Sequence, residues 1–408
     1  MSKTFVVIGG GAAGFFCAIN AARLSPELTV VILEKTPKLL SKVKVSGGGR
    51  CNVTHNCQSV SDLLKNYPRG QNFLKKAFSH FSTIDTVNWF DEREVSLKAE
   101  ADGRMFPATD SSQTIIDCFL EEARKYEVKI HSQWNVHSIT KLDTGFEITS
   151  DKGQKIDADF TCIACGGFPK KEQFDWITQL GHSIESPVPS LFTFNIPKNP
   201  ITELMGISLP LATVKVAGSK LVESAPLLIT HWGMSGPAVL RLSSWGARVL
   251  SEKGYQFTGL VHWVPEMNEE MIRAEIQKIR FSSPTQKIQN ATLFRLPQRL
   301  WQFLIDRAGI TEDLRWTDLP SKEQNRLIKV LTNDEYPVNG KTTFKEEFVT
   351  CGGVKLAEVD PTTMESRIIP NLFFAGEILD IDGITGGFNF QHAWTSGWLA
   401  AKTVTNRL

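Results

Sequence analysis

Three glycines and a glutamate near the N-terminus have the spacing of a dinucleotide-binding turn. Gly9, Gly11 and Gly14 form the pattern G-x-G-x-x-G. Such glycines allow a tight turn, close approach of a pyrophosphate and close packing of the following helix. Glu34 lies twenty residues after Gly14, where an acidic side chain accepts hydrogen bonds from an adenosine ribose. The spacing predicts an adenine dinucleotide, contacted by these four residues and by Ala12, Ala13 and Lys35.

The segments around this pattern have the order strand, turn, helix and strand that the motif requires. Residues 5–8 are apolar and mostly β-branched, residues 15–22 continue as a helix, and residues 28–33 form a second apolar strand. The stretch 5–22 also resembles a signal peptide or a membrane span, but its three consecutive glycines disfavour an isolated spanning helix. We therefore expect this stretch in the fold interior. The alternative to a nucleotide site is a glycine-rich turn in an ordinary βαβ unit.

A second glycine-rich segment follows closely. Lys42 precedes a run that combines small residues with a cation: Ser46, Gly47, Gly48, Gly49, Arg50, Cys51 and Asn52. Such a run suits an extended cofactor with pyrophosphate and sugar groups to be wrapped. The alternative is a surface turn with a solvated arginine. The first glycine motif alone does not separate FAD from NAD, and this second segment helps because it suits a cofactor with pyrophosphate and ribityl groups.

The far end of the chain carries a third candidate segment. Residues 372–375 are an apolar strand, and Gly376 and Glu377 stand at its carboxyl end, where ligands bind in open α/β sheets. Asp380 follows, and glycines then precede a helical stretch over residues 391–404. The start of a helix presents backbone N–H groups and a positive dipole end. Beside a flavin ring, this end would stabilise the negative charge of the reduced form.

Four longer motifs make the sequence recognisable: SGGGRCN at 46–52, DGRMFP at 102–107, HWGMSGPAVL at 231–240 and NLFFAGEILDIDGITGGFN at 371–389. Over nearly its whole length the chain resembles the BaiN-like NAD(P)/FAD-dependent oxidoreductases, also described as aminoacetone-oxidase-family FAD-binding flavoproteins. These belong to the two-dinucleotide-binding-domain flavoproteins. The resemblance implies FAD, with Glu34 on the adenosine ribose and residues 46–52 along the cofactor. It also implies Gly376 and Glu377 at the ribityl chain, and four residues near the flavin ring: Gly387, Phe388, Asn389 and Phe390.

Two further cofactor contacts are expected from similar flavoproteins. A strand beginning at Val136 would reach the adenine through its backbone. The apolar strand over residues 156–164 ends where that class has an Ala-Thr-Gly motif, here Ala-Cys-Gly with Cys165 and Gly166. We interpret the C-x-x-C formed by Cys162 and Cys165 as buried core cysteines rather than as a metal site.

Two other cysteines, Cys51 and Cys57, follow glycines as a redox dithiol does in glutathione-reductase-like enzymes. Those enzymes separate the pair by four residues, whereas five residues separate the pair here. We therefore expect neither a redox disulfide at this place nor a bound metal.

The patterns together predict an α/β fold with a Rossmann-like, glutathione-reductase-like FAD-binding domain and an inserted β-plus-helical domain. Residues 1–190 form the first part of the FAD-binding domain and residues 346–408 its C-terminal part. Between them, residues 191–345 lose the dinucleotide pattern, and helical periodicity dominates residues 269–331. No second G-x-G-x-x-G follows a strand, so NAD(P)H would bind without a dinucleotide fold of its own, or only transiently.

Two residues are candidates for the chemistry itself. His231 stands on a glycine-rich turn and could donate a proton or bind substrate; the alternative is a histidine that caps backbone groups. Arg104 could clamp a substrate carboxylate or carbonyl, but it could equally hold the cofactor phosphates or an ion pair.

The composition is that of an ordinary globular protein. The 408 residues have a net charge of +1, with 41% apolar and 22% charged residues, which gives no electrostatic footprint for nucleic acid and no sign of wholesale disorder. Seven cysteines form no dense disulfide framework. We expect a cytoplasmic protein acting on a small molecule, with no nucleic-acid or membrane partner and an undetermined oligomeric state.

These observations predict an FAD-dependent oxidoreductase that transfers hydride through flavin N5. The favoured reaction is NAD(P)H-linked reduction of a small organic substrate. One alternative is an FAD-dependent oxidase of a small amine or amino acid that uses oxygen. A second alternative is a non-catalytic flavin-binding redox sensor or accessory protein.

Overall fold

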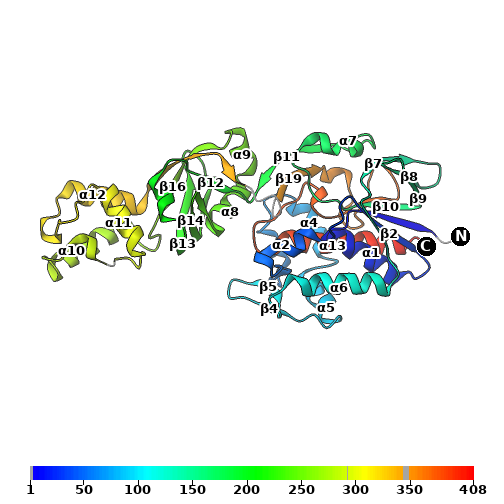
Figure 1. Cartoon of the computed structure of the whole chain (residues 1–408), viewed down its shortest axis with the longest axis horizontal. Coiled ribbons are helices and arrows are strands. Elements are labelled where there is room, and N and C mark those ends of the chain that lie inside the picture. The colour runs from blue at the N-terminus through cyan, green and yellow to red at the C-terminus, as the bar shows by residue number, and fades with distance from the viewer. Residues whose placement is uncertain (1–2, 292, 343–348) are drawn as a thin grey trace. The chain divides into compact units, whose positions relative to one another are not determined.

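A computed structural model of the protein describes residues 3–291, 293–342 and 349–408. The chain divides into two compact units, each with its own hydrophobic core (Figure 1). Unit 1 combines Met1–Ser190 with Phe344–Leu408, and unit 2 is Leu191–Thr343. Because unit 1 contains both ends of the chain, it joins the two glycine-rich N-terminal segments to the C-terminal one.

The centre of unit 1 is a sheet of five strands, β1 (Thr4–Ile8), β2 (Thr29–Glu34), β6 (Lys129–Ser132), β10 (Phe160–Ile163) and β20 (Leu372–Phe374). Their order is β20-β10-β1-β2-β6, and every neighbouring pair is parallel. Parallel sheets are covered on both faces, which explains why β1, β10 and β20 read as continuous apolar runs. This sheet confirms the predicted α/β fold with a Rossmann-like core.

The single strand predicted over residues 156–164 is wrong, because two strands share this stretch. β9 (Lys155–Ala158) belongs to another sheet, and β10 begins only at Phe160. The break is Asp159, which is tied to the start of β1. Its carboxylate accepts the N–H of Thr4 at 2.7 Å, and its own N–H donates to the carbonyl of Thr4 at 2.9 Å. A polar residue bonded in this way turns the chain from one sheet into the next.

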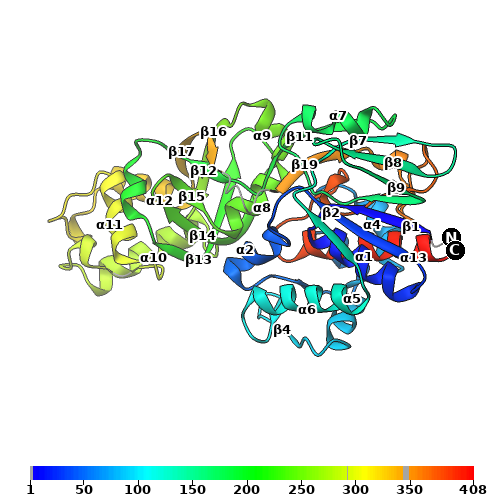
Figure 2. The ribbon, with the colours of Figure 1, turned by 45° about the vertical axis from the view of Figure 1, so that its right-hand side comes forward.

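Three small sheets complete the strands of unit 1. They are the sheet β3 (Thr54–His55), β5 (Arg104–Pro107) and β4 (Leu97–Ala99), the meander β7 (Val136–Lys141), β8 (Phe146–Ser150) and β9, and the pair β11 (Ile184–Ser190) and β19 (Val349–Val354). Figure 2 shows the meander as a hairpin-like extension beside β1 and β2. All three sheets are antiparallel. Short turns join β4 to β5 and the strands of the meander, whereas β11 and β19 are far apart in the sequence.

The helices of unit 1 are α1 (Ala12–Leu24), α2 (Ser41–Gly49), α3 (Val60–Leu64), α4 (Gln71–Phe78), α5 (Thr83–Asp91), α6 (Ser112–Lys125), α7 (Asp175–Thr178) and α13 (Phe388–Thr405). A 3-10 turn (Lys171–Phe174) leads directly into the short α7. The longest helix, α13, packs along α1.

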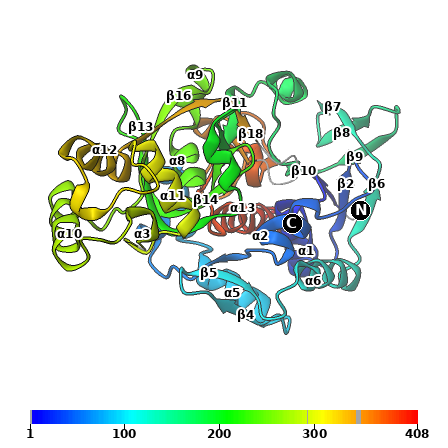
Figure 3. The same ribbon diagram turned by 60° about the vertical axis from the view of Figure 1, so that its left-hand side comes forward.

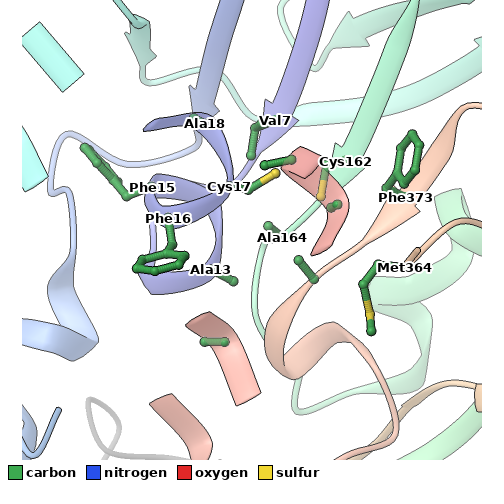
Figure 4. Packing of buried hydrophobic residues seen from close by; sticks show 14 of the residues in the cluster. Val7, Ala13, Phe15, Phe16, Cys17, Ala18, Cys162, Ala164, Met364 and Phe373 are labelled. Atoms are coloured by element: carbon green, nitrogen blue, oxygen red, sulfur yellow. The ribbon is translucent and has the colours of Figure 1, made fainter. Parts of the chain in front are cut away.

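The core of unit 1 fills the space between α1, the parallel sheet and α13. The Phe16 ring lies 5.4 Å from the Trp394 ring, measured between centroids. Figure 4 shows α1 side chains such as Cys17 beside Val7 and Cys162 from the strands. Because residues 5–8 and 13–22 are all buried, the expectation that the N-terminal apolar stretch lies in the fold interior is confirmed. Within the described ranges, no helix combines the length and hydropathy that a bilayer span requires.

Unit 2 is built on a seven-stranded antiparallel sheet of order β17-β16-β13-β14-β15-β12-β18. Its strands are β12 (Thr193–Asn195), β13 (Ser208–Val216), β14 (Val222–Thr230), β15 (Gly233–Ser235), β16 (Gln256–His262), β17 (Asp334–Asn339) and β18 (Lys341–Thr342). The alternation of buried and exposed residues along β14 and β17 is that of strands with one covered face.

Five helices accompany this sheet: α8 (Pro237–Trp245), α9 (Ala247–Glu252), α10 (Glu269–Ser282), α11 (Gln298–Arg307) and α12 (Ser321–Thr332). Figure 3 shows α10, α11 and α12 gathered at one end of unit 2. The buried carboxylate of Asp334 ties strand to helix: it accepts from Arg307 Nη2 at 2.6 Å and from Trp263 Nε1 at 3.1 Å. A buried charge is stable only when it is paired in this manner.

Candidate functional site

The dinucleotide-binding turn with Gly9, Gly11 and Gly14, which we call the fingerprint turn, lies between the end of β1 and the start of α1. A Cβ on Gly9 would lie 2.4 Å from the carbonyl oxygen of Ala164, and a Cβ on Gly14 would lie 1.9 Å from that of Gly9. Both positions therefore require glycine for packing. Gly11 differs, because a Cβ there would meet no described atom within 4 Å beyond its immediate neighbours. Gly11 is the N-cap residue of α1, and no side chain caps this helix start. The N–H groups of Ala12 and the following residues therefore face an open position that an anion could occupy.

Glu34 ends β2 beside this turn. One carboxylate oxygen accepts the N–H of Gly10 at 2.8 Å, and the other accepts the N–H and hydroxyl of Thr36 at 2.8 and 2.9 Å. The backbone N–H of Trp134 donates to the Glu34 carbonyl at 2.9 Å, which brings the chain leading to Val136 next to the same residue. Glu34, the fingerprint turn and the start of β7 thus share one end of the sheet. Lys35 lies near the turn that follows β10, with its Nζ 5.5 Å from the centroid of the Phe168 ring.

The second glycine-rich segment is a turn in which three glycines adopt left-handed backbone conformations. Gly47, Gly48 and Gly49 have φ values of 59°, 69° and 85°. Arg50 leaves this turn and forms an ion pair with Glu100 at 2.7 Å, while its guanidinium lies 4.0 Å from the centroid of the Phe106 ring. The structure therefore gives Arg50 a protein partner rather than an open, solvated position.

Ser46 and Cys51 flank the left-handed glycines. The Ser46 hydroxyl donates to the carbonyl of Val43 at 3.0 Å. Cys51 is fully buried, and burial raises the pKa of its thiol to about 12. All seven cysteines are free thiols. A neutral, buried thiol is a poor nucleophile, so Cys51 has the properties of a packing residue.

Asn52 connects the second glycine-rich segment to the third. In the amide orientation that satisfies both ends of its side chain, the oxygen accepts the N–H of Gly387 at 2.9 Å and the nitrogen donates to the carbonyl of Thr54 at 3.1 Å. A Cβ on Gly387 would lie 2.5 Å from that same carbonyl oxygen. Gly387 precedes α13. The loop at 46–52 and the start of α13 are therefore neighbours, although more than three hundred residues separate them.

The first residues of α13 mostly contact protein. The Phe388 ring stacks on His55, with centroids 4.9 Å apart, and the Phe390 ring stacks on Trp394 at 5.5 Å. The Asn389 side chain both accepts from and donates to the backbone of Gly383, at 2.8 and 2.9 Å. These side chains shape the loop, and only backbone groups at the helix start remain for a ring-side contact.

Gly376 and Glu377 follow β20 at the same end of the sheet. Glu377 accepts from the Lys42 ammonium at 2.6 Å and from the N–H of Thr350 at 2.8 Å. A Cβ on Gly167 would lie 3.1 Å from the Glu377 carboxylate, so the turn after β10 runs beside it. Among the turn residues, Gly166 has a left-handed φ of 78° and Cys165 is half-buried. The expectation of buried core cysteines thus fits Cys162, whereas Cys165 is only half-buried and packs against the edge of the core. Asp380 lies farther along, with its N–H bonded to the carbonyl of Val354.

The two residues predicted to act on substrate occupy different units. Arg104, in unit 1, pairs with Glu100 at 2.8 Å and with Asp102 at 2.7 Å. Two carboxylates neutralise its charge, which agrees with the ion-pair interpretation and leaves no unpaired cation for a substrate carboxylate. His231, in unit 2, is exposed and its ring contacts Trp232, with centroids 4.2 Å apart.

Sequence reasoning missed several residues that hold the site together. Thr350 belongs to the segment TCGGV, whose glycines signal a close backbone approach, yet its bond to Glu377 could not be read from the pattern. His55 and Ser396 contact Phe388 and Gly376, respectively, and neither lies in a glycine motif. A histidine and a serine outside any motif carry no sequence signal of a site.

The residues present fit an adenine dinucleotide with a long sugar chain. The open position at Gly11 could take a pyrophosphate, Glu34 lies beside that turn, and the carboxyl ends of β10 and β20 add Gly166 and Glu377. Left-handed Gly48 and Gly49 leave space in which added side-chain carbons would meet no described atom within 4 Å. All of these features lie in unit 1, on the one edge of the parallel sheet where α/β folds bind ligands.

The chain resembles known proteins over nearly its whole length. The family model described as HI0933-like protein Rossmann domain matches residues 3–403. The "3-dehydro-bile acid delta(4,6)-reductase" of Clostridium scindens is 28% identical over 409 residues, covering 98% of this chain and 98% of that protein. The "Ribosomal RNA dihydrouridine synthase" of Escherichia coli is 30% identical over 406 residues, covering 97% of this chain and 96% of that protein.

Solved structures share the fold at low sequence identity. The 3-ketosteroid delta1-dehydrogenase of Sterolibacterium denitrificans superimposes with a TM-score of 0.54 at 12% identity, covering 100% of both chains. The 3-ketosteroid-delta4-(5alpha)-dehydrogenase of Rhodococcus jostii RHA1 gives a TM-score of 0.50 at 13% identity, covering 98% of this chain and 97% of that one. At such identities the likeness concerns the fold.

Proposed function

Because the chain belongs to the HI0933-like family, we propose that it reduces a carbon–carbon double bond conjugated to a carbonyl group, with NAD(P)H as the electron donor. As a member of this family it is an FAD-dependent oxidoreductase. We propose three features of its reaction: the kind of bond reduced, the size of the substrate and the source of the electrons.

One observation carries the proposal on the bond. Two relatives that match over nearly the full length of both chains are named for the saturation of double bonds. A delta(4,6) double-bond system in a 3-dehydro-bile acid is conjugated to the 3-keto group, and dihydrouridine is uridine with the ring double bond next to a carbonyl saturated. The two named substrates differ in size and charge, but the reacting groups share one chemistry. We extend that shared chemistry to this chain.

The chain's own residues would supply binding and orientation. Glu34 would bind the adenosine ribose, the backbone around Gly11 the pyrophosphate, and Glu377 with Gly166 the sugar chain. The start of α13 would direct backbone N–H groups and a positive dipole end toward negative charge in the ring, which stabilises a reduced anionic flavin. When bound, FAD supplies a two-electron redox centre. None of these residue roles requires the substrate to be known.

A small conjugated ketone is our first candidate substrate, and RNA is the second. The near-neutral net charge of +1 gives weak long-range attraction to a polyanion. The second candidate rests on the 30% identity to the ribosomal RNA enzyme of Escherichia coli. The two relatives named above are a reductase and a dihydrouridine synthase, so they do not favour the amine oxidase that the sequence raised as an alternative.

The experiment mixes purified holoenzyme with NADPH or NADH under anaerobic conditions and follows the absorption of oxidised flavin. We expect rapid bleaching with at least one nucleotide. The reduced enzyme is then mixed with a 3-oxo-4-ene steroid, and separately with an unmodified ribosomal RNA transcript. Return of the flavin absorption, together with a product that has gained two hydrogen atoms, supports the proposal and identifies the substrate class. Free FAD at the same concentration is the control.

Two outcomes would contradict the proposal. If neither nucleotide bleaches the flavin but a small amine does, the enzyme is an oxidase or a dehydrogenase of amines. If the reduced flavin is reoxidised by oxygen and by none of the conjugated carbonyl compounds tested, double-bond reduction is wrong even though NAD(P)H is the donor.

A further inference from the structure

Two side chains of α13 form hydrogen bonds with the turn that follows β20. Gly376 has a left-handed φ of 75°. Its N–H donates to the hydroxyl oxygen of Ser396 at 2.8 Å, and its carbonyl accepts from Nε2 of His392 at 3.1 Å. His392 and Ser396 are four residues apart, so they lie on one face of the helix. One helix face therefore binds both backbone polar groups of a single glycine.

The hydrogen-bond arrangement fixes which group donates and which accepts. The Ser396 hydroxyl donates to the carbonyl of His392 at 2.6 Å, which leaves its lone pairs directed to the N–H of Gly376. His392 donates through Nε2 to a carbonyl, so the neutral ring carries its proton on that nitrogen. Both side chains are buried, at 2% and 0% exposure. Water therefore does not compete for these bonds.

The same glycine also packs closely against α1. A Cβ on Gly376 would lie 2.8 Å from the Cβ of Ala13, the second residue of that helix. The neighbouring residue, Glu377, is bound by Lys42 and by the N–H of Thr350. The turn thus joins the start of α1, where the pyrophosphate would bind, to the carboxylate expected at the sugar chain. A small rotation of Gly376 would change both at once.

We propose that His392 and Ser396 are positioning residues for FAD: they hold the turn of Gly376 and Glu377 in the conformation that binds the cofactor. The inference depends on the FAD site in unit 1 and is independent of which double bond the enzyme reduces. Groups that are already ordered before binding do not lose further conformational freedom when the ligand arrives. Loss of the hydrogen bonds from these two side chains to Gly376 therefore weakens FAD binding by more than it destabilises the fold.

The chain offers a matched control on the same helix. Thr395 is also fully buried, and its hydroxyl donates to the carbonyl of Phe81 at 3.0 Å and accepts from Gln391 at 3.1 Å. It stands next to Ser396 but points away from Gly376. Thr395→Val removes a buried hydroxyl of the same kind without touching the turn. Any general effect of losing a polar group inside α13 is therefore present in the control.

The test measures the Kd of the full-length apoprotein for FAD by flavin fluorescence, together with its thermal unfolding by circular dichroism. Ser396→Ala and His392→Leu are expected to raise the Kd about tenfold or more. Thr395→Val is expected to lower the unfolding temperature while leaving the Kd within about twofold of wild type. His392→Gln, whose amide nitrogen can donate to Gly376, is expected to restore most of the affinity.

The proposal is overturned if Ser396→Ala and His392→Leu bind FAD as wild type does, or if Thr395→Val raises the Kd as much as they do. Ser396→Ala removes one oxygen and introduces the best helix-forming residue, so it keeps the test decisive if the leucine variant does not fold. A wild-type apoprotein that does not bind FAD would refute the cofactor assignment itself. Failure to reduce any conjugated ketone would leave these binding constants, and hence this inference, untouched.

Discussion

The two glycine-rich turns of unit 1 contain the same residue for different reasons. In the fingerprint turn, a side chain at Gly9 or Gly14 would collide with backbone oxygens at 2.4 and 1.9 Å. In the second turn, Gly48 and Gly49 have left-handed φ values of 69° and 85°, and an added Cβ on either would meet no described atom within 4 Å. The first turn is glycine-rich because neighbours crowd it. Gly48 and Gly49 are glycines because the backbone adopts a conformation that other residues avoid. Gly47 shares that conformation and is also crowded, since a Cβ there would lie 2.9 Å from the Phe106 ring.

This difference separates the effect of packing from the effect of conformation. Gly9 and Gly14 are part of the core contact between β1, β10 and α1, whereas Gly47, Gly48 and Gly49 are exposed. Substitutions at Gly9 or Gly14 should therefore affect folding, and substitutions at Gly48 or Gly49 should affect mainly the local backbone and a ligand that approaches it. The following predictions test that distinction, from the largest expected effect to the smallest.

Gly14→Ala should be the most damaging change. The added methyl would lie 1.9 Å from the Gly9 carbonyl oxygen, and relieving this overlap requires α1 to move away from β1. Overpacking of this kind costs about 3 kcal/mol or more of unfolding free energy. Urea unfolding of the apoprotein should show a large loss of stability or no folded protein. Gly11→Ala is the control, since its methyl meets open space; it should fold normally and lose FAD affinity alone. Equal stability of the two variants would contradict the comparison.

Glu34→Ala should come second, because it acts mainly on the ligand. If the carboxylate binds the ribose hydroxyls, its loss removes charge-assisted hydrogen bonds worth about 1.5–3 kcal/mol, or about a tenfold to hundredfold increase in the Kd for FAD. The carboxylate also holds the N–H groups of Gly10 and Thr36, so we expect a loss of stability of about 1 kcal/mol as well. Titration of the apoprotein with FAD measures the first effect. The exposed Glu121→Ala in α6 controls for charge, and a wild-type Kd for Glu34→Ala would refute the ribose assignment.

The outcome for these residues shows which parts of a site a sequence can reveal. Gly9, Gly14 and Glu34 are tied to β1, α1 and β2, which follow one another in the chain, so their spacing reflects the local geometry directly. The parallel sheet was predictable for the same reason, because short apolar runs alternate with helices. Contacts that close over long separations left no such pattern. The bond from Asn52 to Gly387 and the ion pair of Lys42 with Glu377 depend on tertiary structure that no local spacing records.

The strand predicted over residues 156–164 failed for a related reason. Apolar periodicity continues through β9 and β10, and only the bonds between Asp159 and Thr4, on a strand far away in sequence, end one and begin the other. The small sheet of β3, β4 and β5 was missed because its strands are short and separated by the helices α3 to α5. Three-residue strands carry too few residues for a periodicity to be recognised.

Cys51 lies where the exposed second turn meets the core, so its thiol reports whether the turn is anchored there. Burial raises the pKa of this thiol to about 12, whereas an unfolded thiol ionises near 9. Between these values the unfolded state loses the proton first, so stability falls as the pH rises. By pH 10 this costs about 1.4 kcal/mol. Comparing urea unfolding of wild type and Cys51→Ala at pH 8 and pH 10 isolates the effect, since the variant lacks this contribution.

Iodoacetamide at pH 8 should modify the half-buried Cys57 and spare Cys51. Rapid labelling of Cys51 would show that the second turn is not anchored in the core.

Gly48→Ala should have the smallest effect on the fold. Its methyl meets open space, so only the left-handed backbone conformation opposes it, at a cost of about 1 kcal/mol. Asparagine tolerates this conformation better than alanine, so Gly48→Asn should regain part of that loss, which urea unfolding can resolve. The two variants should nevertheless raise the Kd for FAD alike, because each places a side chain in the space that we assign to the cofactor. The Kd could instead follow stability, being raised in the alanine variant and close to wild type in the asparagine variant. In that case the glycines of the second turn are needed only for the backbone conformation, and the cofactor lies elsewhere. At Gly14 no such rescue is expected, since a larger side chain only worsens the collision with the Gly9 carbonyl.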